Sequence, residues 1–269
     1  MAQTLDGIVL LGWLEKAEAV AFLQQGCWFD PQITTEAAED LCLKYRNAVA
    51  QLPERAILKP SRLPIPGASV PWVNKFLARH KGPEVLDVIN IDPRTLGIYQ
   101  FYVAVDRSEH HAKSISRKQW TETCLVIDRA GAQLPIRAED HILKVTLPHA
   151  EHMVALRPDG AFQIQQGGGY VCVCEVEGRM ILKAGYHRSF AFARTLNAPE
   201  ASDISLLVAL TATAPAQLLP QSPAGLRTIV LGSCPPLFSD FFNDSLAMRV
   251  KLRRKRYEAH IHIEQVDDL

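Results

Sequence analysis

The sequence predicts a soluble α+β protein with a helical N-terminal portion, residues 1–52, a proline-rich connector, residues 53–84, and a mixed β-sheet body, residues 85–269. Three observations predict this arrangement. Apolar residues recur at helical spacing before residue 53, six prolines fall between residues 53 and 83, and short β-favouring runs follow residue 85. Hydrophobic residues make up 48% of the 269 residues, which is enough for a packed core and excludes disorder for most of the chain.

Two helices are expected in the N-terminal portion. Residues 15–25 are rich in helix-forming residues and stop at Gly26, a natural C-cap. Thr35 is expected to cap a second helix that Pro53 ends. The apolar residues of this second helix recur at i, i+3, i+4 and i+7: Ala38, Leu41, Cys42, Tyr45, Ala48, Val49 and Leu52. Inside the connector, residues 73–80 are expected to form a short helix.

The body is expected to consist mainly of strands. The first group lies at residues 85–91, 96–105, 124–127, 142–147 and 161–164. The most legible segment follows, with a strand at 170–176, a tight turn at Glu177 and Gly178, a strand at 179–183 and a helix from Ser189. Strands at 204–211 and 226–231, a loop and helix around 235–244 and a C-terminal pair of strands complete the body.

Charge and composition exclude several classes of protein. Twenty-nine basic and 29 acidic residues give zero formal net charge, so no global field draws the chain to nucleic acid or to an anionic membrane. Neither a secretory signal nor a transmembrane stretch is expected, which predicts a cytoplasmic protein without a membrane partner. Six scattered cysteines in a chain of this length indicate reduced core thiols. The oligomeric state is left open.

The turn before the helix at Ser189 carries the main candidate site. A helix N-terminus offers unpaired backbone N–H groups and a partial positive charge. Gly185 permits a tight turn and a close approach to a ligand, and His187 and Arg188 add side-chain donors. Ser189 is expected to cap the helix or to donate its hydroxyl. This strand-turn-helix corner is therefore predicted to bind phosphate.

The same segment, residues 170–194, resembles the ParB/sulfiredoxin-like superfamily. In that superfamily a strand ends in a Gly-x-[His/Glu]-Arg turn, which opens an alanine-containing helix. The matching residues are Gly185, His187 and Arg188, followed by Ala191. The resemblance implies that this turn handles nucleotide phosphates.

Two positions depart from the pattern of the superfamily. Ala184 stands where many members have an aspartate, and Tyr186 stands where sulfiredoxins carry their reactive cysteine. Reduction of sulfinic acids is therefore not expected of this chain. The resemblance bears on phosphate binding more than on any particular reaction, and no cofactor is predicted.

If the protein is an enzyme, the expected reaction is phosphoryl transfer or phosphodiester cleavage, in which positioning and charge neutralisation dominate. His187 and Glu175 are the candidate catalytic residues, with Glu177 as the other nearby acid. The alternative is purely structural. In that interpretation, His187 and Arg188 cap and pair within the fold, and Gly185 only makes the turn.

A basic run near the C-terminus is a second candidate site. It carries Arg249, Lys251, Arg253, Arg254, Lys255 and Arg256. In a neutral protein this is the one patch able to bind a polyanion, which suggests a non-enzymatic nucleic-acid-associated regulator. Only Tyr257 provides an aromatic nearby in sequence, and such a run also suits the solvated face of an edge strand. A scaffold subunit without a small ligand is the third alternative.

Two pairs of residues, one of cysteines and one of histidines, are candidate metal sites. Cys172 and Cys174 share one strand face, with His149 and His152 in the preceding segment, but buried inert thiols explain them as well. His260 and His262, continued by Glu264, also share a face, which a solvent-facing polar side explains equally. No metal is predicted at either pair.

Overall fold

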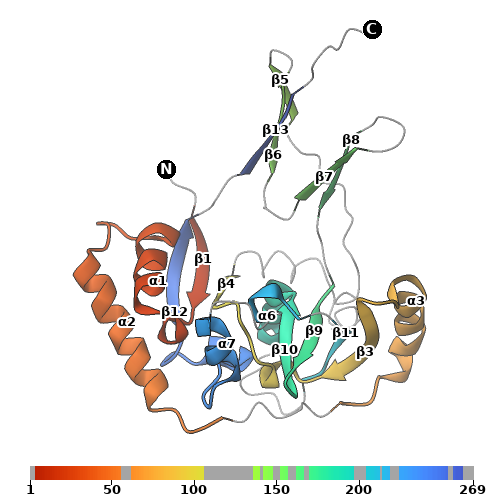
Figure 1. Ribbon diagram of the computed structural model, residues 1–269, viewed down its shortest axis with the longest axis horizontal. Coiled ribbons are helices and arrows are strands. Elements are labelled where there is room, and N and C mark those ends of the chain that lie inside the picture. Colours follow the sequence, from red (N-terminus) through yellow and green to blue (C-terminus); the bar gives the residue numbers. More distant parts are fainter. Residues whose placement is uncertain are drawn as a thin grey trace. The chain divides into compact units, whose positions relative to one another are not determined.

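The computed structural model describes residues 4–55, 62–105, 136–139, 142–147, 152–156, 162–166, 170–196, 204–212, 214–218, 224–253 and 257–262. These residues form helices and β-sheets, which confirms the α+β class (Figure 1). The chain divides into two compact units. The first combines Met1–Val126 with Tyr170–Arg253, and the second combines Ile127–Gly169 with Arg254–Leu269.

One sheet of the first unit contains strands from both the beginning and the end of that unit's sequence. Its strands are β1 (Thr4–Val9), β2 (Cys27–Trp28), β4 (Tyr102–Ala104) and β12 (Met248–Arg253), in the order β2-β12-β1-β4 with every pair antiparallel. Helices α1 (Lys16–Ala21) and α2 (Thr35–Ala50) lie beside β1 and β12 (Figure 1). They bury one face of the sheet, including Val9, Val250 and Leu252.

Local sequence explains where these two helices begin and end. The hydroxyl of Thr34 accepts a hydrogen bond from the Ala37 N–H at 3.2 Å, so the cap lies one residue before the predicted Thr35. Ala38, Cys42 and Tyr45 are buried at positions i, i+4 and i+7 of α2, as the spacing predicts. After α1 the chain makes one π-helical turn, η2 (Phe22–Gly26), so Gly26 is its last residue and Cys27, not the predicted Gly26, is the C-cap.

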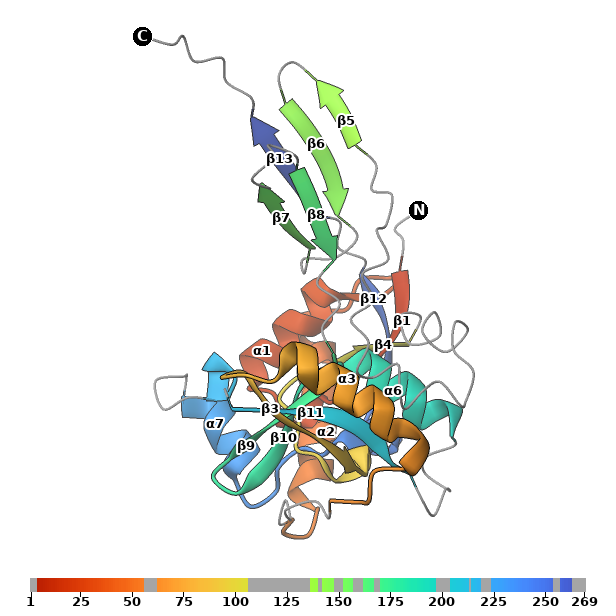
Figure 2. The ribbon, with the colours of Figure 1, turned by 90° about the vertical axis from the view of Figure 1, so that its right-hand side faces the viewer.

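The second sheet of the first unit is covered on both faces. Its strands are β3 (Val85–Ile91), β9 (Cys172–Val176), β10 (Arg179–Ala184) and β11 (Leu206–Thr211), in the order β10-β9-β11-β3. Only the β9–β11 pair is parallel. Helix α6 (Tyr186–Thr195) packs on one face. Helices α3 (Val70–His80) and α7 (Ala224–Leu231) cover the other face, with α3 over β3 and β11 (Figure 2).

The second unit consists of β-structure in its described residues. Strands β5 (Ile136–Glu139), β6 (Ile142–Leu147) and β13 (Tyr257–His262) form an antiparallel sheet in the order β13-β6-β5. Strands β7 (His152–Leu156) and β8 (Phe162–Gln166) form a separate antiparallel pair. The predicted strand at 142–147 is confirmed, and the one at 161–164 corresponds to β8. The predicted strand at 124–127 lies outside the described residues.

Four expectations about the elements are wrong. Residues 1–52 are not entirely helical, because β1 pairs with β12 and β4. The segment 96–105 is a strand only over Tyr102–Ala104; before it, Gly97 makes isolated bridges to Ile181 and Leu237. Residues 226–231 belong to helix α7, since a short apolar run fits a buried helix as well as a buried strand. The two C-terminal strands, β12 and β13, lie in different sheets.

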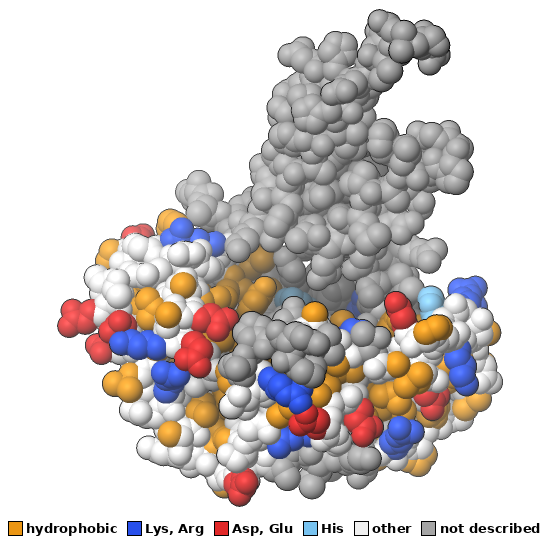
Figure 3. Space-filling view, in the orientation of Figure 1, with side chains coloured by type: hydrophobic (Ala, Val, Ile, Leu, Met, Phe, Trp, Pro, Cys, Tyr) orange, Lys and Arg blue, Asp and Glu red, His pale blue; other side chains and the backbone are white. Residues whose placement is uncertain are grey.

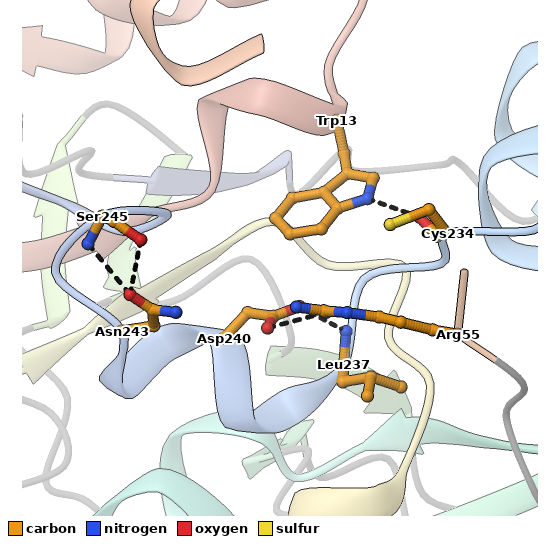
Figure 4. Close-up of polar contacts among 7 residues, drawn as sticks. All are labelled: Trp13, Arg55, Cys234, Leu237, Asp240, Asn243 and Ser245. Carbon is orange, nitrogen blue, oxygen red and sulfur yellow. Dashed lines mark hydrogen bonds and ion pairs between the residues drawn. The ribbon is translucent and has the colours of Figure 1, made fainter. Parts of the chain in front are cut away.

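A buried ion pair links Arg55, which follows α2, to Asp240 of the 3-10 helix η6 (Phe238–Phe242). Nη1 of Arg55 donates to Oδ1 and Oδ2 of Asp240 at 2.8 and 2.7 Å, and the Leu237 N–H donates to Oδ2 at 2.8 Å (Figure 4). Nearby, Nε1 of Trp13 donates to the Cys234 carbonyl at 2.9 Å. Burial raises the pKa of Asp240 above its usual 3.8 although Arg55 lowers it, so desolvation outweighs the pairing.

We therefore predict that removing one partner of this ion pair lowers the unfolding free energy strongly, whereas removing both charges lowers it much less. Asp240→Ala leaves the Arg55 guanidinium without its carboxylate and should cost about 3–5 kcal/mol of unfolding free energy in urea denaturation. The double variant Arg55→Met/Asp240→Leu should cost much less, because it removes both desolvation penalties. An Asp240→Ala variant as stable as the parent would contradict this account.

Candidate functional site

The predicted corner lies where β10 ends and α6 begins. Strands β9 and β10 form a hairpin whose turn, Glu177 and Gly178, has positive φ angles of 50° and 77°. Strand β10 ends at Ala184, and Gly185 follows with φ 92° and ψ 20° as the N-cap of α6. The helix therefore begins at Tyr186, three residues before the predicted Ser189.

Gly185 is required by both its backbone angles and its surroundings. Its φ lies in the left-handed region that side chains disfavour. A Cβ atom there would stand 2.7 Å from Cγ2 and 2.9 Å from Cα of Val171, the residue just before β9. The end of β10 thus packs directly on the backbone of the neighbouring strand segment, and only glycine fits.

Gly178 offers a matched comparison, since its φ is 77° but nothing lies within 4 Å of a Cβ built on it. Gly178→Ala should cost only the backbone strain, about 1–2 kcal/mol. Gly185→Ala should cost clearly more, because the Val171 contact adds overpacking of about 1–3 kcal/mol. Urea denaturation of both variants measures the difference, and equal losses would show that the Val171 contact contributes nothing.

The N-cap of α6 is Gly185, which has no side chain to cap the helix. The first intrahelical bond runs from the Ser189 N–H to the Gly185 carbonyl at 2.8 Å. No side chain caps the N-terminus of α6, and its first turn contains no acidic residue. Helix α2 differs, with the Thr34 cap and Glu36 in its first turn. The N-cap residue and the first turn of α6 therefore supply neither a capping side chain nor an acid to offset the partial positive charge at the helix start.

The side chains of this turn differ in exposure. His187 is half-buried, whereas Arg188 is 8% exposed and Ser189 is fully buried. Ser189 does not cap the helix, contrary to expectation, because the helix starts three residues earlier and buries it; its Oγ has no hydrogen-bond partner. The Tyr186 hydroxyl fixes the helix start by donating to the Leu182 carbonyl at 2.6 Å. The backbone N–H groups of the first turn and the half-buried His187 ring are the remaining candidate donors, although Nε2 of that ring is buried.

The candidate acids lie away from this turn. Glu175 is exposed on β9 and pairs in register with Met180, whereas Ala184 pairs with Cys172. Met180 and Ala184 are four positions apart, which is about 13 Å along a strand. Glu177 lies at the hairpin turn and forms an ion pair with Arg227 of α7. The structure therefore does not bring Glu175 together with His187 as a catalytic pair.

The basic run lies partly on β12. Arg249, Lys251 and Arg253 are exposed and alternate with buried Val250 and Leu252. β12 lies between β1 and β2, so it is not the edge strand that the sequence suggested. Arg254, Lys255 and Arg256 lie outside the described residues. No local sequence pattern indicates that Trp28, on β2, lies directly opposite Lys251.

The candidate metal ligands do not gather among the described side chains, which contain no cluster of three or more histidine, cysteine or acidic residues suited to a metal. Cys172 and Cys174 are buried in the second sheet, where burial raises the pKa of each thiol to about 11. His260 and His262 lie on β13 and His152 on β7, and their side chains are not described. His149 and Glu264 lie outside the described residues.

The raised thiol pKa values predict chemical inertness and a pH dependence. At pH 8 a thiol of pKa 11 is about 0.1% thiolate, so Cys172 and Cys174 should resist alkylation until the protein unfolds. Because the folded pKa exceeds the usual 9.0, these thiols stabilise the fold below pH 9, and that contribution is lost as the pH rises towards 11. Mass spectrometry after alkylation tests the first point. A flatter alkaline stability curve in Cys172→Ala/Cys174→Ala tests the second.

Comparison of the chain with protein-family models, with curated proteins and with solved structures finds no match. Among the described residues, no helix has both the length and the apolar character needed to cross a membrane. Figure 3 shows basic and acidic side chains interspersed over one face of the molecule, in keeping with a net charge of zero. The candidate site therefore has to be judged on its own chemistry.

Proposed function

We propose that the first unit binds a phosphate group of a nucleotide or nucleic acid at the start of α6. One observation carries the proposal: the N-terminus of this ten-residue helix has neither a side-chain cap nor an acid in its first turn, and half-buried His187 lies in that turn. Backbone N–H groups and the positive end of a helix are the donors that phosphate sites in proteins use repeatedly.

The side chains around the turn support an anion in different ways. His187 places a half-buried imidazole at the second position of the helix, and Nε2 of that ring is buried. Arg188, the third residue of α6, is only 8% exposed, so its charge can act on an anion at the turn only through its field. Its role in the proposal is therefore electrostatic, and direct contact with phosphate falls to the backbone and His187.

The proposal concerns binding and not catalysis. The likeness of residues 170–194 to the ParB/sulfiredoxin-like superfamily, in which this turn handles nucleotide phosphates, favours a nucleotide as the ligand. No acid accompanies His187 in the described part of the turn, since Glu175 lies at the other end of the hairpin. A nucleotide ligand and buried free thiols also agree with the cytoplasmic location that we propose for the protein.

His187→Glu tests the proposal because it moves stability and binding in opposite directions. A carboxylate in the first turn should compensate the helix dipole and raise the unfolding free energy by about 0.3–1 kcal/mol. The same carboxylate should repel phosphate and abolish the rise in melting temperature that ATP or pyrophosphate gives the parent protein. Thermal denaturation with and without these ligands measures both effects.

Val70→Glu is the matched control. It places a carboxylate in the first turn of α3, which also lacks a side-chain cap and an acid, on a residue that is 41% exposed. This variant should gain similar stability and keep the response to ATP and pyrophosphate. If the parent shows no response to either ligand, or if both variants respond as the parent does, the proposed site is wrong.

A further inference from the structure

The exposed face of β12 presents an ordered row of cations. Arg249, Lys251 and Arg253 are exposed at alternate positions, while Val250 and Leu252 between them are buried. Alternate residues of a strand lie on one face, about 7 Å apart. Because β12 is hydrogen-bonded to β1 on one side and to β2 on the other, the backbone that carries this row is fixed within the sheet.

An aromatic side chain flanks this row. Trp28 on β2 is 40% exposed and is the register partner of Lys251, so both lie on the same face. The Arg253 guanidinium lies 5.8 Å from the centre of the indole ring. Arg253 is itself anchored, since Nε donates to the Cys27 carbonyl at 2.9 Å and Nη2 to Oε1 of Gln32 at 2.6 Å. The indole and the guanidinium are therefore held together as one exposed surface.

The charge of this surface favours a polyanion. Lys251 pairs with Asp6, and Arg249 lies 3.7 Å from Asp244, but both pairs are more than half exposed and so contribute little to stability. A phosphate backbone can replace such weak partners. In the sequence, three more basic residues follow directly: Arg254, Lys255 and Arg256.

We propose that this face binds single-stranded nucleic acid, with a base stacked on Trp28 and phosphates bound by Lys251 and Arg249. Cations along a strand beside an exposed aromatic ring are the combination that proteins use for single strands, because every base offers a face for stacking. A duplex keeps its bases paired and would meet only the cations. The proposal does not depend on the site at the start of α6.

Trp28→Ala, compared with Trp72→Ala, tests the stacking. Trp72 on α3 is 41% exposed and has the Lys75 ammonium 5.5 Å from its ring, so the two tryptophans match in exposure and in cation contact. Binding of the full chain to fluorescein-labelled oligothymidylate is measured by anisotropy at low salt. Trp28→Ala should weaken binding about 5- to 150-fold, Trp28→Phe much less, and Trp72→Ala not at all.

Arg249→Gln/Lys251→Gln tests the phosphate contacts. The slope of log affinity against log salt should become shallower by about 1.4, since two phosphate contacts are lost. Lys16→Gln/Arg46→Gln is the control, because it removes two exposed cations of α1 and α2 that also pair with acids, Glu39 and Glu15. This control should keep the parent slope.

Several results would overturn the proposal. They are an absence of oligothymidylate binding, equal losses in Trp28→Ala and Trp72→Ala, or duplex binding as tight as single-strand binding. Loss of oligothymidylate binding in His187→Glu would also overturn it, because the strand would then be bound at the start of α6.

Discussion

The close approach of Gly185 to Val171 sets the geometry on which the candidate phosphate site depends. A Cβ at Gly185 would lie 2.7 Å from the Val171 side chain, so β10 can pass straight into α6 only with glycine at that position. The positive φ of Gly185 turns the chain onto the face of the sheet. Helix α6 then buries Tyr186 and Phe190 against the strands, and Phe190 stacks on Phe242 with ring centres 4.9 Å apart.

This packing decides which groups of the turn remain for a ligand. Starting the helix at Tyr186 carries Arg188 and Ser189 into the interior, where they are 8% and 0% exposed. The backbone N–H groups of the first turn and the half-buried His187 are left as the candidate donors. A site of this kind recognises phosphate as a class, because backbone donors carry no information about the rest of the ligand. Specificity for a particular nucleotide has to come from other side chains.

Elements fixed by local signals were predictable from the sequence. Strand β3 has the predicted bounds, and the hairpin turn at Glu177 and Gly178 follows from turn chemistry. The elements that were predicted wrongly depend on partners that are distant in sequence. The register of β1 with β12 pairs Thr4 with Arg253, across nearly the whole chain, and no local pattern reveals such a pairing. The apolar run that forms helix α7 predicts a strand equally well, because it is too short to show a period.

For the candidate sites, too, local features could be predicted from the sequence, whereas features that depend on distant contacts could not. Gly185 and the donors beside it could be identified because a glycine between a strand pattern and a helix pattern is a local turn signal. The burial of Arg188 and Ser189 could not be predicted, because it depends on where the helix starts and on which residues pack against it. Nor could the position of Trp28 beside Lys251, because the two residues are adjacent only through the β2–β12 register.

The most direct test of the phosphate site is an NMR titration of the ¹⁵N-labelled protein with pyrophosphate, read at individual backbone amides. The account predicts that the amide resonances of Gly185, Tyr186 and His187 move together and saturate with one dissociation constant, because their N–H groups face the anion. Fixed resonances at these three residues while amides elsewhere in the first unit shift would contradict it.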